Sequence, residues 1–145
     1  MNHNLFLRTQ KVLSKITLKT PLIFDEYLSN KMDAKIFMKA ESLQRTGSFK
    51  IRGAYNYLYN MKRKNFQRGV LAWSSGNHAQ AVAYVSNYYG IPATIVMPNN
   101  APKIKIENTK KYGAKIILYD PLHESREKIT SEISDGDKPA SFMAS

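Results

Sequence analysis

Two short segments of this 145-residue chain combine residue types that could perform chemistry. The first spans residues 39–54 and places Lys50 in the expected first turn of a helix, where the helix dipole disfavours a positive charge. A lysine that can lose its proton can form a Schiff base with an aldehyde cofactor and later act as a base. The alternative for any single lysine is a solvated surface cation.

The second segment, residues 74–80, reads Ser-Ser-Gly-Asn-His-Ala-Gln and follows an apolar run. A strand that ends in small residues and opens a helix brings several free backbone N–H groups to one point. Such a loop is an anion site that suits a carboxylate, although the same pattern also describes an ordinary helix start. Both segments are expected where an α/β sheet binds its ligands, at the junction between a strand and the next helix.

The elements that must position these segments follow from hydrophobic periodicity. Apolar, β-favouring runs alternate with helical stretches, which indicates successive βα units and a parallel sheet. We expect an α/β fold, a small three-layer parallel sheet with flanking helices. Strands are predicted over 35–40, 70–74, 93–98 and 114–119, and helices over 48–61, 78–89, 103–112 and from about 123. Gly90 and Gly113 follow two of these helices, where a left-handed conformation is expected.

The two ends of the chain are less regular. A short helix around 10–16 precedes an extended Thr20-Pro21 segment, and Asp135-Gly136-Asp137-Lys138-Pro139 has turn chemistry. We therefore predict an N-terminal segment at 1–40, a small α/β domain at 41–134 that carries both motifs, and an unstructured tail at 135–145.

Composition narrows the remaining function classes. The formal net charge of +11 invites a nucleic-acid-binding module as a minor alternative, but the cations are dispersed and the cluster at Lys62, Arg63 and Lys64 falls in an expected loop. The chain has no cysteine, and His3, His78 and His123 lack the spacing of a metal site, so no metal is expected. No run is long enough to span a bilayer, and we expect a cytoplasmic protein without membrane or nucleic-acid partners.

At the level of whole motifs, the chain resembles the threonine/serine dehydratase and serine racemase branch of the fold type II pyridoxal phosphate enzymes. The resemblance rests on Gln44-Arg-Thr-Gly-Ser-Phe-Lys50, followed by Ser74-Ser-Gly-Asn-His-Ala-Gln80. It extends over about residues 18–134, with further matching stretches at 90–98, 101–108, 112–120 and 124–127. In that family, residues 41–134 correspond mainly to the small domain.

The resemblance implies pyridoxal 5′-phosphate as cofactor and L-threonine or L-serine as substrate, with release of a 2-oxo acid and ammonia. By the same resemblance, Lys50 would form the internal aldimine and take the Cα proton, Phe49 would pack beside the cofactor, and Asn77 would bind the 3′-oxygen of its ring. The substrate carboxylate would be held by Ser74, Ser75, Gly76, Asn77 and His78. Ser75 also matches the serine that reprotonates the opposite face of Cα in racemases, so the dehydratase and racemase alternatives both stay open.

One feature of the family is absent from the sequence. Its members bind the cofactor phosphate in a glycine-rich loop, whereas none of the seven glycines here is adjacent to another. We therefore expect a truncated or decayed member, with impaired dehydratase activity or none, and a homodimer as in the family.

Overall fold

The computed structural model describes residues 3–61, 69–135 and 141–143. The elements are α1 (His3–Leu13), β1 (Leu22–Phe24), α2 (Glu26–Met32), β2 (Phe37–Lys39), the 3-10 helices η1 (Glu41–Leu43) and η2 (Arg45–Gly47), α3 (Lys50–Asn60), β3 (Val70–Trp73), α4 (Asn77–Tyr88), β4 (Ala93–Pro98), α5 (Lys103–Lys111), β5 (Lys115–Tyr119), α6 (Arg126–Asp135) and β6 (Ser141–Met143). The expected loop cluster at residues 62–64 lies outside the described residues.

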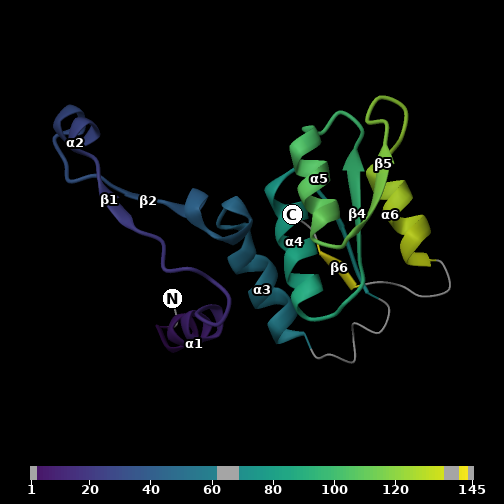
Figure 1. The fold of residues 1–145 in the computed structure, drawn as a ribbon, viewed down its shortest axis with the longest axis horizontal. Helices are drawn as coiled ribbons and strands as arrows, with labels where there is room; N and C mark the ends of the chain where they lie inside the picture. Colours follow the sequence, from purple (N-terminus) through teal and green to yellow (C-terminus); the bar gives the residue numbers. More distant parts are fainter. Residues whose placement is uncertain (1–2, 62–68, 136–140, 144–145) are drawn as a thin grey trace.

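The main sheet is parallel throughout, with strand order β5-β4-β3-β6. Alternate strand residues point to opposite faces. One face, including Val70, Ala72 and Ile95, packs against α3 and α4, and the other, including Leu71 and Val96, packs against α6. Figure 1 shows α4 and α5 on one side of the sheet and α6 on the other. The predicted α/β class, a parallel sheet with flanking helices, is confirmed.

The predicted left-handed glycines after two helices are also confirmed. Gly90 has φ 66° after α4, and Gly113 has φ 88° after α5. Both positions end a helix and turn the chain toward the next strand, where a residue without Cβ avoids steric strain.

The N-terminal part differs from the expectation. The strand predicted over 35–40 forms as β2, but it pairs antiparallel with β1 in a separate two-stranded ribbon and not in the parallel sheet. The helix α2 connects the two strands, capped by Asp25 Oδ1, which accepts from the Leu28 N–H at 2.8 Å, and closed by Asp33 at φ 48°. The chain reverses direction at α2, so that β2 returns alongside β1 and the two strands pair with each other. The ribbon and α2 extend away from the main sheet (Figure 1).

The tail also differs in part from the expectation. Residues 141–143, predicted to be unstructured, form β6 and pair in parallel with β3, with Leu71 opposite Phe142. The reason is tertiary, because β3 has a free edge that offers backbone donors and acceptors to any strand in reach. The rest of the predicted tail after residue 135 lies outside the described residues. Within the described ranges, no helix has the length and apolar content to cross a membrane.

Candidate active site

Lys50 is the first residue of α3, directly after a strained turn. Thr46 and Gly47 in that turn have φ values of 65° and 69°. The buried Ser48 follows, and its Oγ accepts from the Lys50 N–H at 3.4 Å. The Phe49 ring is 59% exposed, and its centroid lies 5.5 Å from the Lys50 ammonium. A left-handed backbone conformation is energetically unfavourable for threonine. Contacts with neighbouring residues must therefore stabilise the turn that positions Lys50.

Gln44 and Arg45 supply those contacts by fastening the turn to the N-terminal segment. The buried Gln44 side chain accepts from the Leu18 N–H at 2.8 Å and donates to the Leu18 carbonyl at 2.9 Å. The Arg45 Nε donates to the Ile16 carbonyl at 2.7 Å. The turn before α3 is therefore held by residues that lie 26 positions before Gln44 and 29 positions before Arg45.

A bidentate ion pair also connects helix α3 to the segment that precedes it. Arg52 Nε and Nη2 donate to the two carboxylate oxygens of Glu41, each at 2.8 Å. Thr20 Oγ1 also donates to Glu41 at 2.6 Å, and Lys39 Nζ donates to the Thr20 carbonyl at 2.6 Å. The hydrogen bond from Arg52 is the main cause that lowers the pKa of Glu41 to about 2, and the same bond raises the pKa of Arg52. The Arg52 guanidinium is thus paired with the Glu41 carboxylate and is not available as an unpaired cation for a ligand.

The second predicted segment forms the loop between β3 and α4, which we call the 74–78 loop (Ser74, Ser75, Gly76, Asn77, His78). The Ser74 N–H donates to the Val96 carbonyl at 3.1 Å, and Ser74 Oγ accepts from the Gly76 N–H at 3.2 Å. Ser75 and Asn77 are exposed, whereas His78 is buried. The N-cap residue of α4 is Gly76, which has no side chain to cap the helix. The first N–H groups of α4 can therefore serve an anion such as a carboxylate.

Packing, and not a direct bond, brings the two segments to one side of the fold. Helices α3 and α4 lie against each other (Figure 1), with Ile51 and Val82 in their shared core. Helix α4 follows β3 in a βα unit, so it runs back from the carboxyl edge of the parallel strands. Among the described residues, no hydrogen bond joins Lys50 to the 74–78 loop, and the Lys50 ammonium contacts Phe49.

The structure adds three side chains that sequence reasoning did not assign. Lys105 Nζ on α5 donates to Asn77 Oδ1 at 2.5 Å. Arg126 at the start of α6 lies over the Trp73 ring, with its guanidinium carbon 5.3 Å from the centroid. Glu41 forms the ion pair with Arg52 described above. No local pattern marks these residues, because each meets its partner through tertiary packing.

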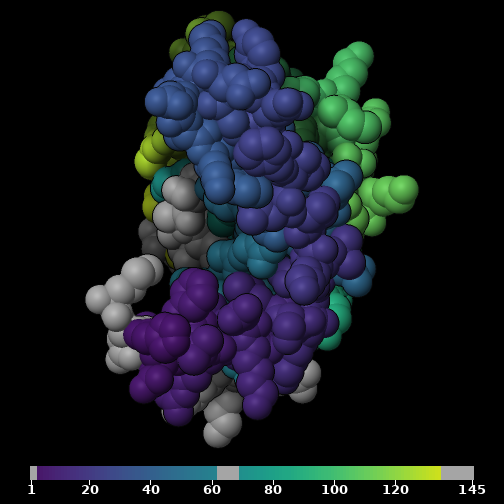
Figure 2. Space-filling view, turned by 90° about the vertical axis from the view of Figure 1, so that its left-hand side faces the viewer, coloured from purple at the N-terminus to yellow at the C-terminus, as the bar shows by residue number. Residues whose placement is uncertain are grey.

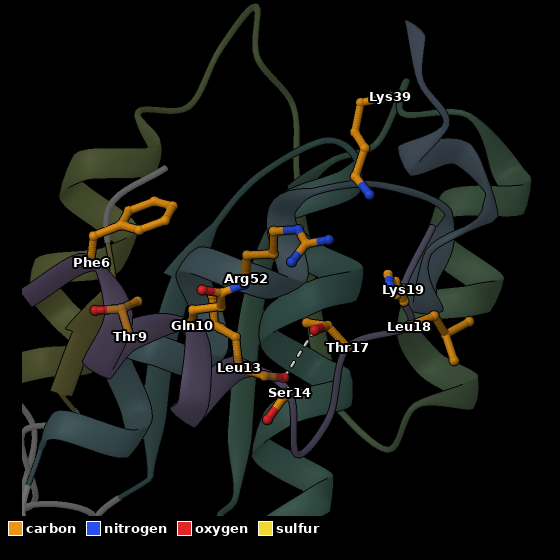
Figure 3. A pocket seen from close by; sticks show the side chains of 10 residues that line it. All are labelled: Phe6, Thr9, Gln10, Leu13, Ser14, Thr17, Leu18, Lys19, Lys39 and Arg52. Carbon is orange, nitrogen blue, oxygen red and sulfur yellow. Dashed lines mark hydrogen bonds between the residues drawn. The ribbon is translucent and has the colours of Figure 1, made fainter. Parts of the chain in front are cut away.

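Two cavities lie near these segments. The smaller, of about 70 Å³, is at the carboxyl ends of β3, β4 and β5 and is lined by Trp73, Ser74, Ser75, Val96, Pro98, Tyr119 and Arg126. The larger, of about 680 Å³, is lined by Phe6, Thr9, Gln10, Leu13, Ser14, Thr17, Leu18, Lys19, Lys39 and Arg52. Figure 3 shows α1 side chains on one side of it and Lys39 and Arg52 on another. None of the predicted site residues lines this larger cavity, which lies at the junction with α1, whereas Ser74 and Ser75 line the smaller one. In the described part of the chain, no group of three or more His, Asp or Glu side chains could hold a metal ion.

Comparisons with known proteins agree with this arrangement. The chain is 42% identical over 123 residues to a serine racemase of Schizosaccharomyces pombe, an alignment that covers 85% of this chain and 38% of that protein. It is 44% identical over 124 residues to an L-threonine ammonia-lyase of Thermotoga maritima, covering 83% of this chain and 31% of that protein. The chain thus spans about a third of the length of these curated relatives.

Solved structures give the same result for the fold. The structure of maize serine racemase superposes with a TM-score of 0.87 at 37% identity, covering 96% of this chain and 42% of that one. A crystal structure of a T.th. threonine deaminase superposes with a TM-score of 0.83 at 30% identity, covering 99% of this chain and 45% of that one. Residues 13–143 also match the family described as pyridoxal-phosphate dependent enzyme. The fold, the position of Lys50 and these matches together lead to one conclusion: the chain belongs to the pyridoxal-phosphate-dependent enzyme family of the serine racemases and threonine ammonia-lyases.

Proposed function

We propose that this chain supplies the reactive lysine and the carboxylate-binding loop of a pyridoxal-phosphate-dependent ammonia-lyase that acts on L-threonine or L-serine. The observation that carries the proposal is Lys50 at the start of α3, a helix that packs beside α4, whose N-cap residue is Gly76 and has no side chain. Ammonia-lyases and racemases among the relatives support the same reading.

The residues present fit three parts of the cofactor and substrate. The Lys50 amine could condense with an aldehyde carbon, and the Asn77 carboxamide could hydrogen-bond the ring 3′-oxygen. The N–H groups of the 74–78 loop could donate to the substrate carboxylate. Phe49 offers an exposed ring next to Lys50. When bound, pyridoxal phosphate supplies a ring that accepts the electrons released at the substrate Cα.

In this proposal the chain's own residues orient the substrate and move one proton. The 74–78 loop holds the carboxylate, Lys50 takes the Cα proton, and the β-hydroxyl then leaves with a proton as water. A water molecule hydrolyses the dehydrated product and releases ammonia. Overall, L-threonine is converted to 2-oxobutanoate and ammonia. No adjacent glycines are present to surround the phosphate, so we expect turnover of the 145-residue chain to fall well below the usual enzymatic range of about 1 per second or more.

Borohydride reduction tests the lysine assignment, because it fixes pyridoxal phosphate covalently to the lysine that has condensed with it. Peptide mapping should find the label at Lys50, and Lys50→Ala should remove it, whereas Lys110→Ala, an exposed lysine of α5, should not. Label spread over many lysines and unchanged in Lys50→Ala would contradict the proposal. Assay of 2-oxobutanoate release from L-threonine tests the expected low turnover.

A second candidate, serine racemase activity, is favoured by Ser75, which is exposed and lines the small cavity beside Ser74. If Ser75 delivers a proton to Cα, Ser75→Ala should reduce D-serine formation from L-serine more than it reduces 2-oxo acid release. Chiral chromatography and a keto-acid assay on the same samples separate the two activities.

The proposal also includes a role in amino-acid metabolism, a cytoplasmic location and a homodimer. Cell fractionation tests the location, and analytical ultracentrifugation tests the oligomeric state.

A further inference from the structure

Lys105 contacts a residue of the candidate site that lies 28 positions away in the sequence. It is the third residue of α5, and its Nζ lies 2.5 Å from Asn77 Oδ1 at the start of α4. Lys105 is partly buried, whereas Asn77 is exposed. A hydrogen bond from an ammonium to a carbonyl oxygen is charge-assisted and stronger than one between neutral groups.

This bond determines which end of the Asn77 carboxamide is occupied. A carboxamide has an acceptor oxygen and a donor N–H₂ group, and an ammonium has donors only. Lys105 can therefore bind the oxygen end alone. Within the described ranges, no group accepts from Asn77 Nδ2, so the N–H₂ end is the one available to a ligand.

The positive charge around Asn77 favours a ligand that is an anion and accepts hydrogen bonds. Lys105 forms no ion pair with a described carboxylate, so its positive charge is not neutralised. Asn77 is also the first residue of α4, where the helix dipole is positive and the N-cap residue, Gly76, has no side chain. An anionic oxygen that accepts hydrogen bonds matches both features.

We propose that Lys105 is a positioning residue that turns the Asn77 carboxamide so that its N–H₂ group, and not its oxygen, is offered to the anionic 3′-oxygen of pyridoxal phosphate. The inference rests on the proposed function. It assigns Lys105 no contact with the cofactor, and its effect passes through Asn77.

The Lys105–Asn77 bond can be tested without cofactor by NMR of the Asn77 side-chain N–H₂ signals. Lys105→Met should shift these signals and let their protons exchange faster, and Lys105→Arg should restore most of the original spectrum. Lys103→Met removes the same charge from an exposed position two residues earlier in α5 and should leave the signals unchanged. Identical Asn77 signals in the wild-type and Lys105→Met chains would overturn the inference.

The functional consequence is tested by the pyridoxal phosphate concentration that half-saturates borohydride labelling at Lys50. Lys105→Met should raise it about tenfold, equivalent to about 1.4 kcal/mol, with most of the loss rescued by Lys105→Arg and none seen in Lys103→Met. In Asn77→Ala, the added Lys105→Met change should have little further effect, because Lys105 acts through Asn77.

The outcomes separate the two proposals. Label at Lys50 with no effect of Lys105→Met, or with fully additive losses in the double variant, overturns the role of Lys105 and leaves the proposed function intact. Absence of label at Lys50 in the wild-type chain, or label at Lys105 instead, overturns both. Circular dichroism of each variant confirms that a loss is not caused by unfolding.

Discussion

Glu41 is the side chain that connects the N-terminal segment to the helix of Lys50. Its carboxylate binds Arg52 of α3 through two bonds and accepts a third from Thr20. The Glu41 side chain is only 16% exposed, so the pair is better shielded from water than an ordinary surface ion pair. Removal of one partner leaves the other partly buried and unpaired.

We therefore expect Glu41→Gln to lower the free energy of unfolding at pH 7 by about 1.5–3 kcal/mol. Glu107→Gln, which changes an exposed glutamate of α5, should stay within about 0.5 kcal/mol of the wild-type chain. Urea denaturation followed by circular dichroism measures both. Equal effects of the two variants would show that the Glu41–Arg52 pair contributes nothing specific.

The same pair predicts a pH dependence. The pKa of Glu41 is lowered in the folded chain from 4.5 to about 2, mainly by the Arg52 hydrogen bond. A lowered folded pKa means that the stabilisation is complete above pH 4.5 and is lost as the pH falls through about 2. The difference in unfolding free energy between the wild-type and Glu41→Gln chains should shrink over that window. A difference that is constant from pH 7 to pH 2 would contradict this assignment.

At the scale of elements, β3 depends on a glycine at its entry. Gly69 has φ 87°, and a Cβ at this position would lie 2.7 Å from the Pro92 carbonyl oxygen. That carbonyl accepts from the Val70 N–H at 2.8 Å, at the point where β3 joins β4. A side chain at position 69 would strain the backbone. It would also displace the Pro92 carbonyl and so weaken its hydrogen bond with the Val70 N–H.

Gly69→Ala should therefore destabilise the fold by more than about 1 kcal/mol. Gly53→Ala is the matched control, because Gly53 lies within α3 at an ordinary helical φ and a Cβ there would meet no atom within 4 Å. It should be stabilising by about 0.5–1 kcal/mol. Thermal melts of both variants check the opposite signs, and a stable Gly69→Ala chain would contradict the steric argument.

The strand β6 makes a second prediction at this scale. Its backbone pairs with β3 over three residues, so the amide protons of Ser141, Phe142 and Met143 that enter the ladder should exchange slowly with solvent. Hydrogen exchange read by mass spectrometry on a peptide covering 141–143 measures this. Exchange as fast as in an unfolded peptide would show that the pairing with β3 does not persist in solution.

At the scale of the whole molecule, the N-terminal segment exposes many large apolar side chains. Every residue of β1 and β2 is exposed, including Ile23 at 47% and its cross-strand partner Met38 at 46%. Figure 2 shows this segment, in purple and blue, spread over one face of the molecule. Exposed apolar side chains that gather on one element promote association.

We expect the chain to bind an apolar fluorescent dye and to self-associate as its concentration rises. The double variant Ile23→Thr with Met38→Thr should reduce both, with little change in the stability of the main sheet, because the ribbon lies outside it. Leu118→Thr with Leu122→Thr changes two exposed leucines elsewhere and serves as the control. Equal dye binding by both double variants would mean that the ribbon is not the associating surface.

The sequence by itself determined the features that depend on neighbouring residues. Periodicity located β3, β4 and β5, and the glycines after α4 and α5 marked the ends of those helices. It also placed Lys50 at the start of one helix and the 74–78 loop at the start of another. Such features are predictable because helix and strand preferences, caps and left-handed glycines act over a few residues.

Only the tertiary structure decided which distant residues meet. The bond from Lys105 to Asn77, the ion pair of Glu41 with Arg52, the antiparallel pairing of β1 with β2 and the position of β6 beside β3 were not predicted. Each of these contacts depends on how whole elements pack. The local sequence around a surface lysine or an edge strand is the same whichever residue or strand lies opposite it. Packing of the helices against the sheet brings these groups within bonding distance. The candidate site therefore consists of residues that could be located from the sequence and of partner residues that could be identified only in the structure.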